Sequence, residues 1–322
     1  MSEMLRVENL KTYFDTRKGM IKAVDNISFS INKGEILGIV GESGAGKSIT
    51  GFSLINLIDS PGKIVAGRIL FNNRDLAQLS EDQLHQIRGG EISMIFQDPQ
   101  MSLNPVITIG KQLIETVTFH NPESSKQDAY KKSIDMLELV GLPAPEKRMT
   151  SYPHQLSGGM KQRIVIAMAL INNPKLLIAD EPTTALDVTI QAQILFLMKK
   201  LTKDYGSSLV LITHDIAVVA QMCDKIAVMY AGRIVEYGSN KDVLHNPKHP
   251  YTKGLIQCLP RLNEEKNRLY QIPGVMPSLL SLPEGCYFSD RCPYADEECK
   301  VYPETTTIEG RLVSCHKIKQ IS

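Results

Sequence analysis

The sequence has almost no net charge, no long apolar run and no recognisable export signal. Its formal net charge is +1, so bulk electrostatics give no reason to expect nucleic acid or an acidic membrane as a partner. No uninterrupted apolar stretch approaches the roughly 20 residues that a membrane-spanning helix needs. The first residues, M-S-E-M-L-R-V-E, lack the basic and apolar pattern of a secretion signal. We therefore expect a cytoplasmic chain, which can still dock onto a membrane protein.

The sequence also lacks any C-x-x-C pair, although it contains six cysteines. Cys223 and Cys258 are isolated, whereas the other four follow the spacing C-x5-C-x6-C-x15-C from residue 286 to residue 315. This spacing fits neither a usual zinc ribbon nor a bacterial ferredoxin run. In a cytosolic chain such a group more often binds metal or does redox chemistry than forms disulfides. The sequence supports four thiolate ligands and leaves the metal unspecified.

A glycine-rich stretch carries the clearest chemical signal. Residues 35–53 read E-I-L-G-I-V-G-E-S-G-A-G-K-S-I-T-G-F-S, and residues 41–48 fit the pattern G-x-x-x-x-G-K-[ST]. The glycines let backbone N–H groups face a phosphate, the lysine supplies a point charge and the serine hydroxyl can bind Mg²⁺. The following helix directs its positive end at the same anion. We expect a nucleotide site formed by Gly41, Glu42, Ser43, Gly44, Ala45, Gly46, Lys47, Ser48 and Ile49.

Polar residues end three other apolar, strand-like runs. Asp180 and Glu181 end K-L-L-I-A-D-E, where Asp180 can hold Mg²⁺ through water and Glu181 can polarise an attacking water. Gln97 ends E-I-S-M-I-F-Q and can reach Mg²⁺ or that water, although taken alone it fits a surface polar residue better. His214 follows S-S-L-V-L-I-T and can bond a γ-phosphate, although taken alone it fits a structural histidine better.

A second glycine-containing turn stands before a strongly amphipathic helix. The sequence L-S-G-G-M-K-Q places Ser157 as the expected N-cap, with two glycines that expose the N–H groups of the helix start. By itself this pattern fits an ordinary capped turn better than a binding site. The candidate residues of a second anion site are Ser157, Gly158, Gly159 and Gln162.

The remaining pattern outlines the architecture. Residues 5–14 and 21–31 predict antiparallel strands, and an aromatic at the end of the first, Tyr13 or Phe14, can stack on adenine or simply pack beside the sheet. Spacing from Asn9 favours Phe14. We expect a helix over about 47–58, a capping box that begins at Ser80, inserted helices within about 106–172, and a hairpin that turns at residues 231–232.

In this order the landmarks resemble the ATP-binding cassette (ABC) ATPase family over residues 1–240. They are G-E-S-G-A-G-K-S, the glutamine at 97, L-S-G-G, L-L-I-A-D-E-P, T-A-L-D and I-T-H-D, of which L-S-G-G is decisive because other phosphate-loop ATPases lack it. The resemblance implies an α/β fold. It comprises a phosphate-loop ATPase core, an antiparallel β subdomain, an inserted α-helical subdomain and a small Cys-rich C-terminal region.

The resemblance also implies a mechanism. Two cassettes form a head-to-tail dimer, in which each ATP lies between the phosphate loop of one subunit and the L-S-G-G turn of the other. By matching position, Glu181 is the catalytic base, His214 clamps the γ-phosphate, and Gln97 senses it and couples to the transmembrane partner. Asp187 lies across the dimer interface. No position departs from the competent pattern, so we expect ATP hydrolysis.

Residues 241–322 resemble one branch of the family, the ATPase subunits of dipeptide and oligopeptide importers. The residues that carry this resemblance are N-P-K-H-P-Y-T-K-G-L, I-P-G-V-M-P and G-C-Y-F-S-D-R-C-P-Y-A-D-E-E-C. The resemblance implies a heterodimer with a second, similar ATPase at the cytoplasmic face of the inner membrane. It also implies two transmembrane permease subunits and an extracytoplasmic peptide-binding protein, with no nucleic acid.

The same resemblance implies a [4Fe–4S] cluster on the four clustered cysteines, with zinc or free thiols as alternatives. The ligands would be Cys286, Cys292, Cys299 and Cys315. Other functions stay open beside peptide import. A nickel or other small-solute importer of the same branch is one, and a soluble ABC protein without a transport role is the other.

Overall fold

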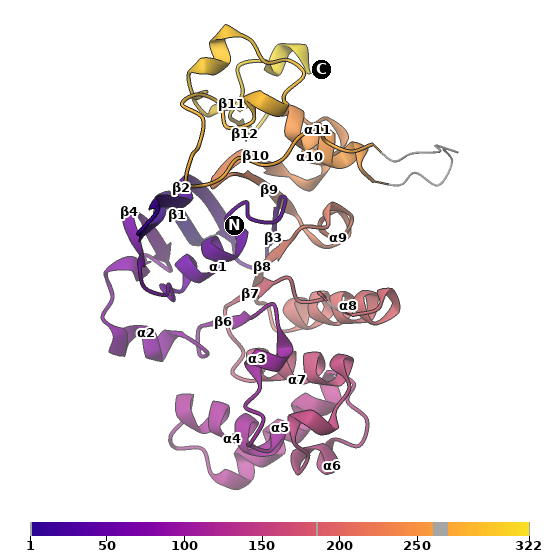
Figure 1. The fold of residues 1–322 in the computed structure, drawn as a ribbon. Coiled ribbons are helices and arrows are strands. Elements are labelled where there is room, and N and C mark those ends of the chain that lie inside the picture. The colour runs from indigo at the N-terminus through magenta and orange to yellow at the C-terminus, as the bar shows by residue number, and fades with distance from the viewer. Residues whose placement is uncertain (1, 185, 260–269, 322) are drawn as a thin grey trace. The chain divides into compact units, whose positions relative to one another are not determined.

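The computed structural model describes residues 2–184, 186–259 and 270–321. Figure 1 labels their helices and strands. Contacts between residues divide the chain into two compact units. The first comprises residues 1–78 and 211–322, and the second comprises residues 79–210. The strand β8 (Ser208–Thr213) contains the boundary between them.

A four-stranded antiparallel sheet forms one layer of the first unit and contains the two antiparallel strands that the sequence predicts. Its strand order is β2-β1-β4-β5, with β1 at Glu3–Thr16, β2 at Gly19–Asn32, β4 at Gly62–Phe71 and β5 at Arg74–Asp75. Apolar residues of β1 that face the core, such as Leu5, Val7 and Leu10, are fully or almost fully buried. Irregular register along β1 marks bulges, which bend the strand.

The second sheet of this unit carries the phosphate loop. Its strand order is β11-β12-β10-β9-β3-β8, in which β3 (Ile36–Val40) lies parallel to β9 and is buried at every residue. The helix α1 (Lys47–Leu54) follows the loop and is shorter than predicted. It ends early because Asn56 takes a left-handed conformation (φ 49°), which stops the helix. The other bounds are β9 Lys225–Tyr230, β10 Arg233–Ser239, β11 Thr306–Ile308, β12 Arg311–Val313, α9 Ile216–Met222, α10 Asn240–His245 and α11 Pro250–Gln257.

The predicted hairpin is confirmed, and it anchors the C-terminal segment. Strands β9 and β10 pair antiparallel, and their turn residues, Ala231 and Gly232, both have positive φ. The strand β12 then pairs antiparallel with β10, and β11 pairs with β12. The segment beyond residue 270 also contains short 3₁₀ turns at Ser289–Arg291, Glu297–Lys300 and Ile318–Gln320. The C-terminal segment therefore extends the sheet of the first unit.

The second unit is mainly helical. Its strands β6 (Ile92–Ile95) and β7 (Leu176–Asp180) pair in parallel, and Ser80 begins α2 (Glu81–Ile87) with the predicted capping box. The predicted helical insertion is present and is built around buried apolar residues such as Leu113, Val117 and Leu137. The helix bounds are α3 Pro99–Ser102, α4 Ile109–His120, α5 Lys126–Leu139, α6 Pro145–Met149, α7 Gly158–Leu170 and α8 Val188–Asp204.

A buried carboxylate in β2 ties the two layers of the first unit together. Asp25 accepts hydrogen bonds from the hydroxyls of Tyr13 (2.6 Å) and Tyr287 (3.2 Å) and forms an ion pair with Arg233 (2.6 Å). Burial alone would raise the pKa of Asp25, but the hydrogen bonds and the nearby guanidinium outweigh it and hold that pKa below its usual value. The carboxylate therefore stabilises the folded chain above its unfolded pKa, and this contribution is lost as the pH falls through the folded pKa.

We expect Asp25→Asn to lower the free energy of unfolding by about 2 kcal/mol, because it leaves a largely buried guanidinium without its counter-charge. Denaturant titration of the whole chain measures the change. The control is Glu8→Gln, whose ion pair with Arg6 is exposed and should matter by less than about 0.5 kcal/mol. Equal losses in the two variants would contradict a structural role for the Asp25 cluster.

Candidate functional site

The phosphate loop connects β3 to α1 and holds its lysine tightly. Lys47 is 5% exposed, and its Nζ donates to the carbonyl oxygens of Gly41 (2.9 Å) and Glu42 (3.0 Å). Gly46 caps α1 with φ 98°, in the left-handed region that favours glycine. The lysine ammonium therefore lies at the start of a helix beside exposed loop amides, which is an anion-binding arrangement.

Two glycines of the loop have no room for a side chain. A Cβ at Gly41 would stand 2.1 Å from the carbonyl oxygen of Met229 in β9. A Cβ at Gly46 would stand 2.1 Å from the carbonyl oxygen of Ala23 in β2. The loop is thus wedged against backbone on two sides, so its shape depends on both glycines.

The L-S-G-G turn forms a capped helix start in the second unit. Ser157 is the N-cap of α7, and its hydroxyl accepts the N–H of Met160 (3.4 Å), as predicted. Gly158 and Gly159 occupy the first turn, where a Cβ on Gly159 would lie 3.1 Å from Ile190. Gln162 is almost fully buried, and among the described atoms its Nε2 has no hydrogen-bond partner. The turn therefore presents N–H groups at a helix start with little side chain in front of them.

The carboxylate after β7 is held in a strained backbone. Glu181 has φ 44°, a left-handed conformation that non-glycine residues rarely adopt and that often marks functional sites. Its Oε2 accepts hydrogen bonds from Gln97 Nε2 (3.2 Å) and Thr184 Oγ1 (2.9 Å). The structure thus brings together Gln97 and Glu181, two candidate residues that are far apart in the sequence. Asp180, the last residue of β7, is 1% exposed.

Two further candidate residues lie at helix starts. Asp187 is the N-cap of α8, where its Oδ1 accepts the N–H of Ile190 (3.0 Å). His214 follows β8, and the next residue, Asp215, caps α9 by accepting the N–H of Ala217 (2.8 Å). The phosphate loop and His214 belong to the first unit, whereas Gln97, the L-S-G-G turn and Asp187 belong to the second.

The two aromatic candidates for adenine stacking are held differently. The hydroxyl of Tyr13 donates to Asp25, and burial together with that carboxylate raises the pKa of Tyr13. Phe14 pairs with Gly62 across β1 and β4, and its ring occupies the space where a Gly62 Cβ would stand. Both residues are partly exposed. Tyr13 is thus tied to the Asp25 cluster, whereas the Phe14 ring lies over Gly62.

The four C-terminal cysteines lie close together in the first unit. Burial, with smaller contributions from the nearby thiols of Cys286, Cys292 and Cys299, raises the pKa of Cys315 to about 12. Backbone N–H groups donate to two of the sulfurs, Tyr294 to Cys292 (3.4 Å) and Lys317 to Cys315 (3.3 Å). Within the described residues, however, no group of three or more His, Cys, Asp or Glu side chains is placed to hold a metal ion. As placed, the described side chains therefore do not form a ready metal site.

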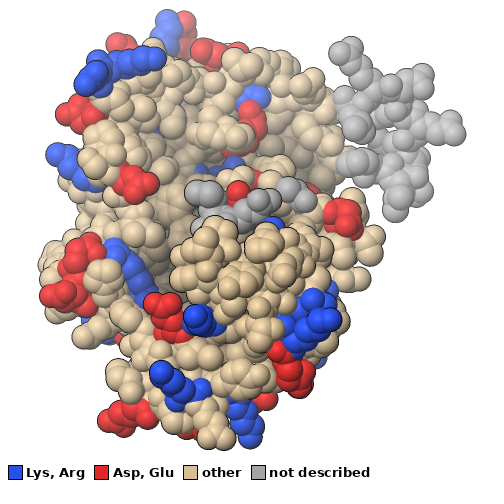
Figure 2. All heavy atoms as spheres, turned by 60° about the horizontal axis from the view of Figure 1, so that its bottom comes forward, with Lys and Arg blue, Asp and Glu red and all other residues tan. Residues whose placement is uncertain are grey.

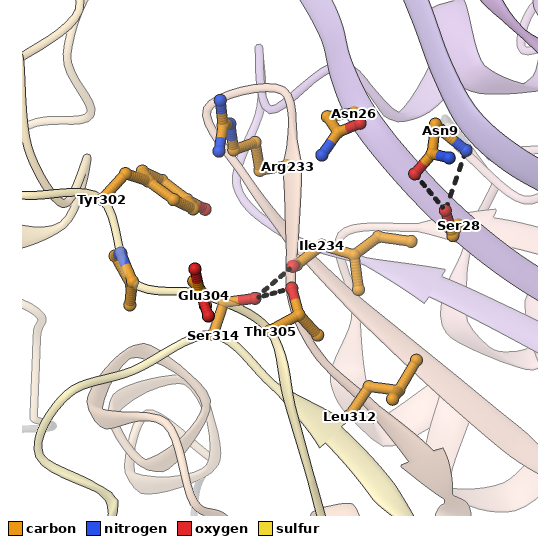
Figure 3. A pocket seen from close by; sticks show the side chains of 11 residues that line it. Asn9, Asn26, Ser28, Arg233, Ile234, Tyr302, Glu304, Thr305, Leu312 and Ser314 are labelled. Atoms are coloured by element: carbon orange, nitrogen blue, oxygen red, sulfur yellow. Dashed lines mark hydrogen bonds between the residues drawn. The ribbon is translucent and has the colours of Figure 1, made fainter.

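A cavity of about 610 Å³ in the first unit lies beside the C-terminal segment (Figure 3). Arg233 and Tyr302 lie on one side of it, and the hydrogen-bonded pair of Asn9 and Ser28 lies on the other. The guanidinium of Arg233 already pairs with Asp25 and lies 3.8 Å from the centroid of the Tyr302 ring. Among the described residues that line this cavity, none is a predicted nucleotide-binding residue, so the cavity is not the predicted nucleotide site.

One polar group of the second unit escaped the sequence analysis. Thr184 donates to Glu181 and thereby orients its carboxylate. The signal was present in the sequence, because a hydroxyl three residues after a carboxylate is well spaced to bond it across a turn.

Charge of neither sign dominates the face that Figure 2 presents. Figure 2 shows Lys and Arg interspersed with Asp and Glu on the face that it presents. Within residues 2–184, 186–259 and 270–321, no helix combines the length and apolarity needed to cross a bilayer.

Family comparisons agree with this arrangement of phosphate loop, L-S-G-G turn and D-E pair. A family model described as ABC transporter matches residues 24–184. A second model, described as the C-terminal region of oligopeptide/dipeptide transporters, matches residues 235–299. The chain belongs to the ABC transporter ATPase family, and the predictions of ATPase class and α/β fold are confirmed.

Individual relatives place the chain within one branch. It is 49% identical over 315 residues to the oligopeptide transport ATP-binding protein OppD of Escherichia coli, covering 98% of this chain and 93% of that protein. It is 51% identical over 318 residues to the dipeptide transport ATP-binding protein DppD of Bacillus subtilis, covering 98% and 95%. A solved dimeric ATP-binding cassette in a post-hydrolysis state, bound to ADP and Pi, is similar with a TM-score of 0.67 and 30% identity, covering 74% of this chain and 99% of that one.

We expect Gly46→Ala to weaken ATP binding at least tenfold, because the new Cβ would collide with the Ala23 carbonyl and displace the loop. Calorimetric titration with ATP measures the change. Gly34→Ala is the matched control, since Gly34 also has positive φ (73°) but open space around it. The control should lose about 1–2 kcal/mol of stability and keep its ATP affinity. An unchanged affinity in Gly46→Ala would show that the loop tolerates a side chain there.

Proposed function

We propose that the chain is the ATP-hydrolysing subunit of an importer for dipeptides or oligopeptides. The observation that carries the catalytic part is the carboxylate of Glu181, held in a strained backbone and oriented by Gln97 and Thr184. The match of residues 235–299 to the C-terminal region of peptide transporters supports the solute class. The names of its relatives, which are oligopeptide and dipeptide transport proteins, support it as well.

In this proposal the loop from Gly41 to Ile49 binds the phosphates of ATP. Its N–H groups face the β- and γ-phosphates, and Lys47, positioned by the carbonyl oxygens of Gly41 and Glu42, donates to phosphate oxygens. Ser48 and Asp180 would hold Mg²⁺, which would neutralise charge on the phosphates, and Gln97 is a further candidate ligand. Phe14 stacks on the adenine ring, because the hydroxyl of Tyr13 is already engaged by Asp25.

Glu181 is the proposed general base. A base must lie within hydrogen-bond reach of the proton that it takes, and the water that loses this proton attacks the γ-phosphorus. Gln97 orients that water and Thr184 fixes the rotamer of the carboxylate, since both donate to Glu181. His214 is the proposed donor to the γ-phosphate, at the end of a buried strand. As the water oxygen bonds to the γ-phosphorus, the bond from that phosphorus to the β–γ bridging oxygen breaks, so that ADP is the leaving group and inorganic phosphate is the other product.

A second cassette completes each nucleotide site in this proposal. Ser157, Gly158, Gly159 and Gln162 of one subunit face the γ-phosphate held by the other, and Asp187 lies near that interface. Two anion-binding helix starts in one chain support such pairing, because head-to-tail contact brings one from each subunit to the same nucleotide. The solved cassette that is similar to this chain is itself dimeric. We infer a heterodimer with a similar ATPase, as in the branch that the sequence resembles.

The other proposed partners are two transmembrane permease subunits, with a peptide-binding protein on the far side of the membrane. The ATPase would then be peripheral, at the cytoplasmic face of the inner membrane. A nickel or other small-solute importer is the alternative, because the ATPase itself does not contact the solute. A soluble, non-transport ABC ATPase is a weaker alternative, since it would leave the transporter-type C-terminal region unexplained.

We further propose that Cys286, Cys292, Cys299 and Cys315 hold a [4Fe–4S] cluster. The support is their mutual proximity and the backbone N–H groups directed at two of the sulfurs, which favour thiolates bound to metal. Zinc is the alternative. The cluster would pin a segment that is rich in turns and short in apolar residues.

We expect Glu181→Gln to reduce ATP turnover by about 10²–10⁴-fold while ATP remains bound, because the amide cannot accept the proton. The mutant should accumulate an ATP-dependent dimer, which size-exclusion chromatography with light scattering detects. Glu91→Gln is the control, since Glu91 pairs with Lys175 at the surface of the same unit. Steady hydrolysis by Glu181→Gln at the wild-type rate would rule out its role as the base.

An anaerobic preparation should be brown and contain about four iron and four sulfide per chain. Cys299→Ser should lose most of both, whereas Cys223→Ser, which changes an isolated buried cysteine, should retain them. Elemental analysis and absorption spectra measure the contents. A colourless preparation with one zinc per chain would replace the cluster with zinc, and a metal-free preparation with four titratable thiols would dismiss both.

A further inference from the structure

The residue before the second clustered cysteine is an almost fully buried arginine that reaches the phosphate loop. The side chain of Arg291 is 5% exposed. Its Nη1 donates to both carboxylate oxygens of Glu42 (3.1 and 3.0 Å) and to the hydroxyl of Tyr230 (3.3 Å). Its Nε donates to the carbonyl oxygen of Pro273 (2.8 Å). One guanidinium therefore connects the C-terminal segment, the end of β9 and the phosphate loop.

Glu42 is the second residue of the loop, and each of its polar groups has a partner. Its carboxylate pairs with Arg291, and its N–H donates to the hydroxyl of Tyr251 in α11 (2.9 Å). Its carbonyl oxygen accepts from Lys47 Nζ (3.0 Å). The residue whose carbonyl oxygen binds Lys47 is thus itself oriented by Arg291 and Tyr251, both of which come after residue 240.

These contacts rest on a packed aromatic cluster. Tyr230 meets Tyr251 (ring centroids 4.7 Å apart) and Phe288 (5.2 Å), both edge to face. The Arg291 guanidinium lies 5.7 Å from the centroid of the Tyr230 ring and 5.8 Å from that of Phe288. Such pairs add about 0.5–1.5 kcal/mol each beyond area burial. The position of Arg291 is therefore set by packing against these rings as well as by its bonds to Glu42.

A second contact joins the same segment to the loop. The segment 272–277 includes Pro273, whose carbonyl receives Arg291, and Met276. The methyl carbon of Met276 would stand 3.2 Å from a Cβ placed on Gly44. The C-terminal segment therefore touches the loop at Glu42 through charge and at Gly44 through packing.

We propose that Arg291 is a positioning residue for ATP binding. Through Glu42 it sets the direction of the carbonyl that holds Lys47, so that the ammonium is presented to the phosphates in one geometry. ATP affinity then depends on the folded C-terminal segment, and by linkage ATP stabilises that segment in return. The inference rests on the proposal that ATP binds at this loop. It adds that Arg291, which lies 249 positions after Glu42 in the sequence, influences ATP affinity at that loop.

The test measures ATP affinity, KM and kcat for Arg291→Gln in the full chain. We expect Kd and KM for ATP to rise about tenfold while kcat at saturating ATP stays within twofold, because the chemistry itself is untouched. Arg291→Lys should recover part of the affinity, since the ammonium keeps the charge but cannot make all the bonds of the guanidinium to Glu42, Tyr230 and Pro273. Arg311→Gln is the control. Arg311 is equally buried in the C-terminal segment but pairs with Glu236 and Glu309, so its loss should lower stability and leave the affinity unchanged.

Glu42→Gln keeps the test decisive if Arg291→Gln fails to fold. Glu42→Gln should also weaken ATP binding. Adding Arg291→Lys to Glu42→Gln should weaken ATP binding little further. Hydrogen exchange in residues 286–299 should slow when ATP is added to the wild-type chain. An affinity within twofold of wild type in a folded Arg291→Gln or Glu42→Gln would overturn the inference, as would equal losses in Arg311→Gln. If wild type and Lys47→Ala bind ATP equally, the proposed nucleotide site itself fails.

Discussion

The structure depends on close backbone packing at the phosphate loop. Two loop residues must be glycine there, because a carbonyl oxygen of a neighbouring strand occupies the space that a side chain would need. Gly41 meets the carbonyl of Met229 in β9, and Gly46 meets the carbonyl of Ala23 in β2, each at a distance that excludes any Cβ. The loop is thus fixed by both sheets of the first unit. Buried strands on one side and the helix α1 on the other can then present N–H groups and Lys47 to an anion.

The second unit carries other candidate site residues, and their positions are likewise fixed by backbone conformation and hydrogen bonds. A helix start capped by Ser157 presents N–H groups, and a carboxylate at Glu181 stands on a left-handed residue. A strained backbone conformation persists only where surrounding interactions hold the residue in place. The hydrogen bonds from Gln97 and Thr184 to Glu181 are interactions of this kind. One chain thus carries two helix starts of the kind that binds anions, and in the proposed dimer one from each subunit would face the same nucleotide.

The sequence predicted what short-range patterns determine. The phosphate loop, the Ser157 cap, the Ser80 capping box and the turn at residues 231–232 each depend on residue types within a few positions. It could not predict contacts between distant segments, such as Arg291 with Glu42 or Arg233 with Asp25, which are separated by 249 and 208 positions. The end of α1 was missed because the left-handed Asn56 overrides an otherwise helical run. Sequence periodicity and motif spacing reveal neither contacts between distant segments nor the backbone conformation of a single residue.

The central claim is that each ATP is hydrolysed between two cassettes. Its most direct test is the ATPase rate per chain, measured as a second cassette is titrated in, either another copy of this chain or the similar ATPase proposed as its partner. The account predicts a saturable rise with concentration, from a very low rate for the monomer. A full rate in dilute solution, at a concentration where light scattering finds only monomer, would contradict it.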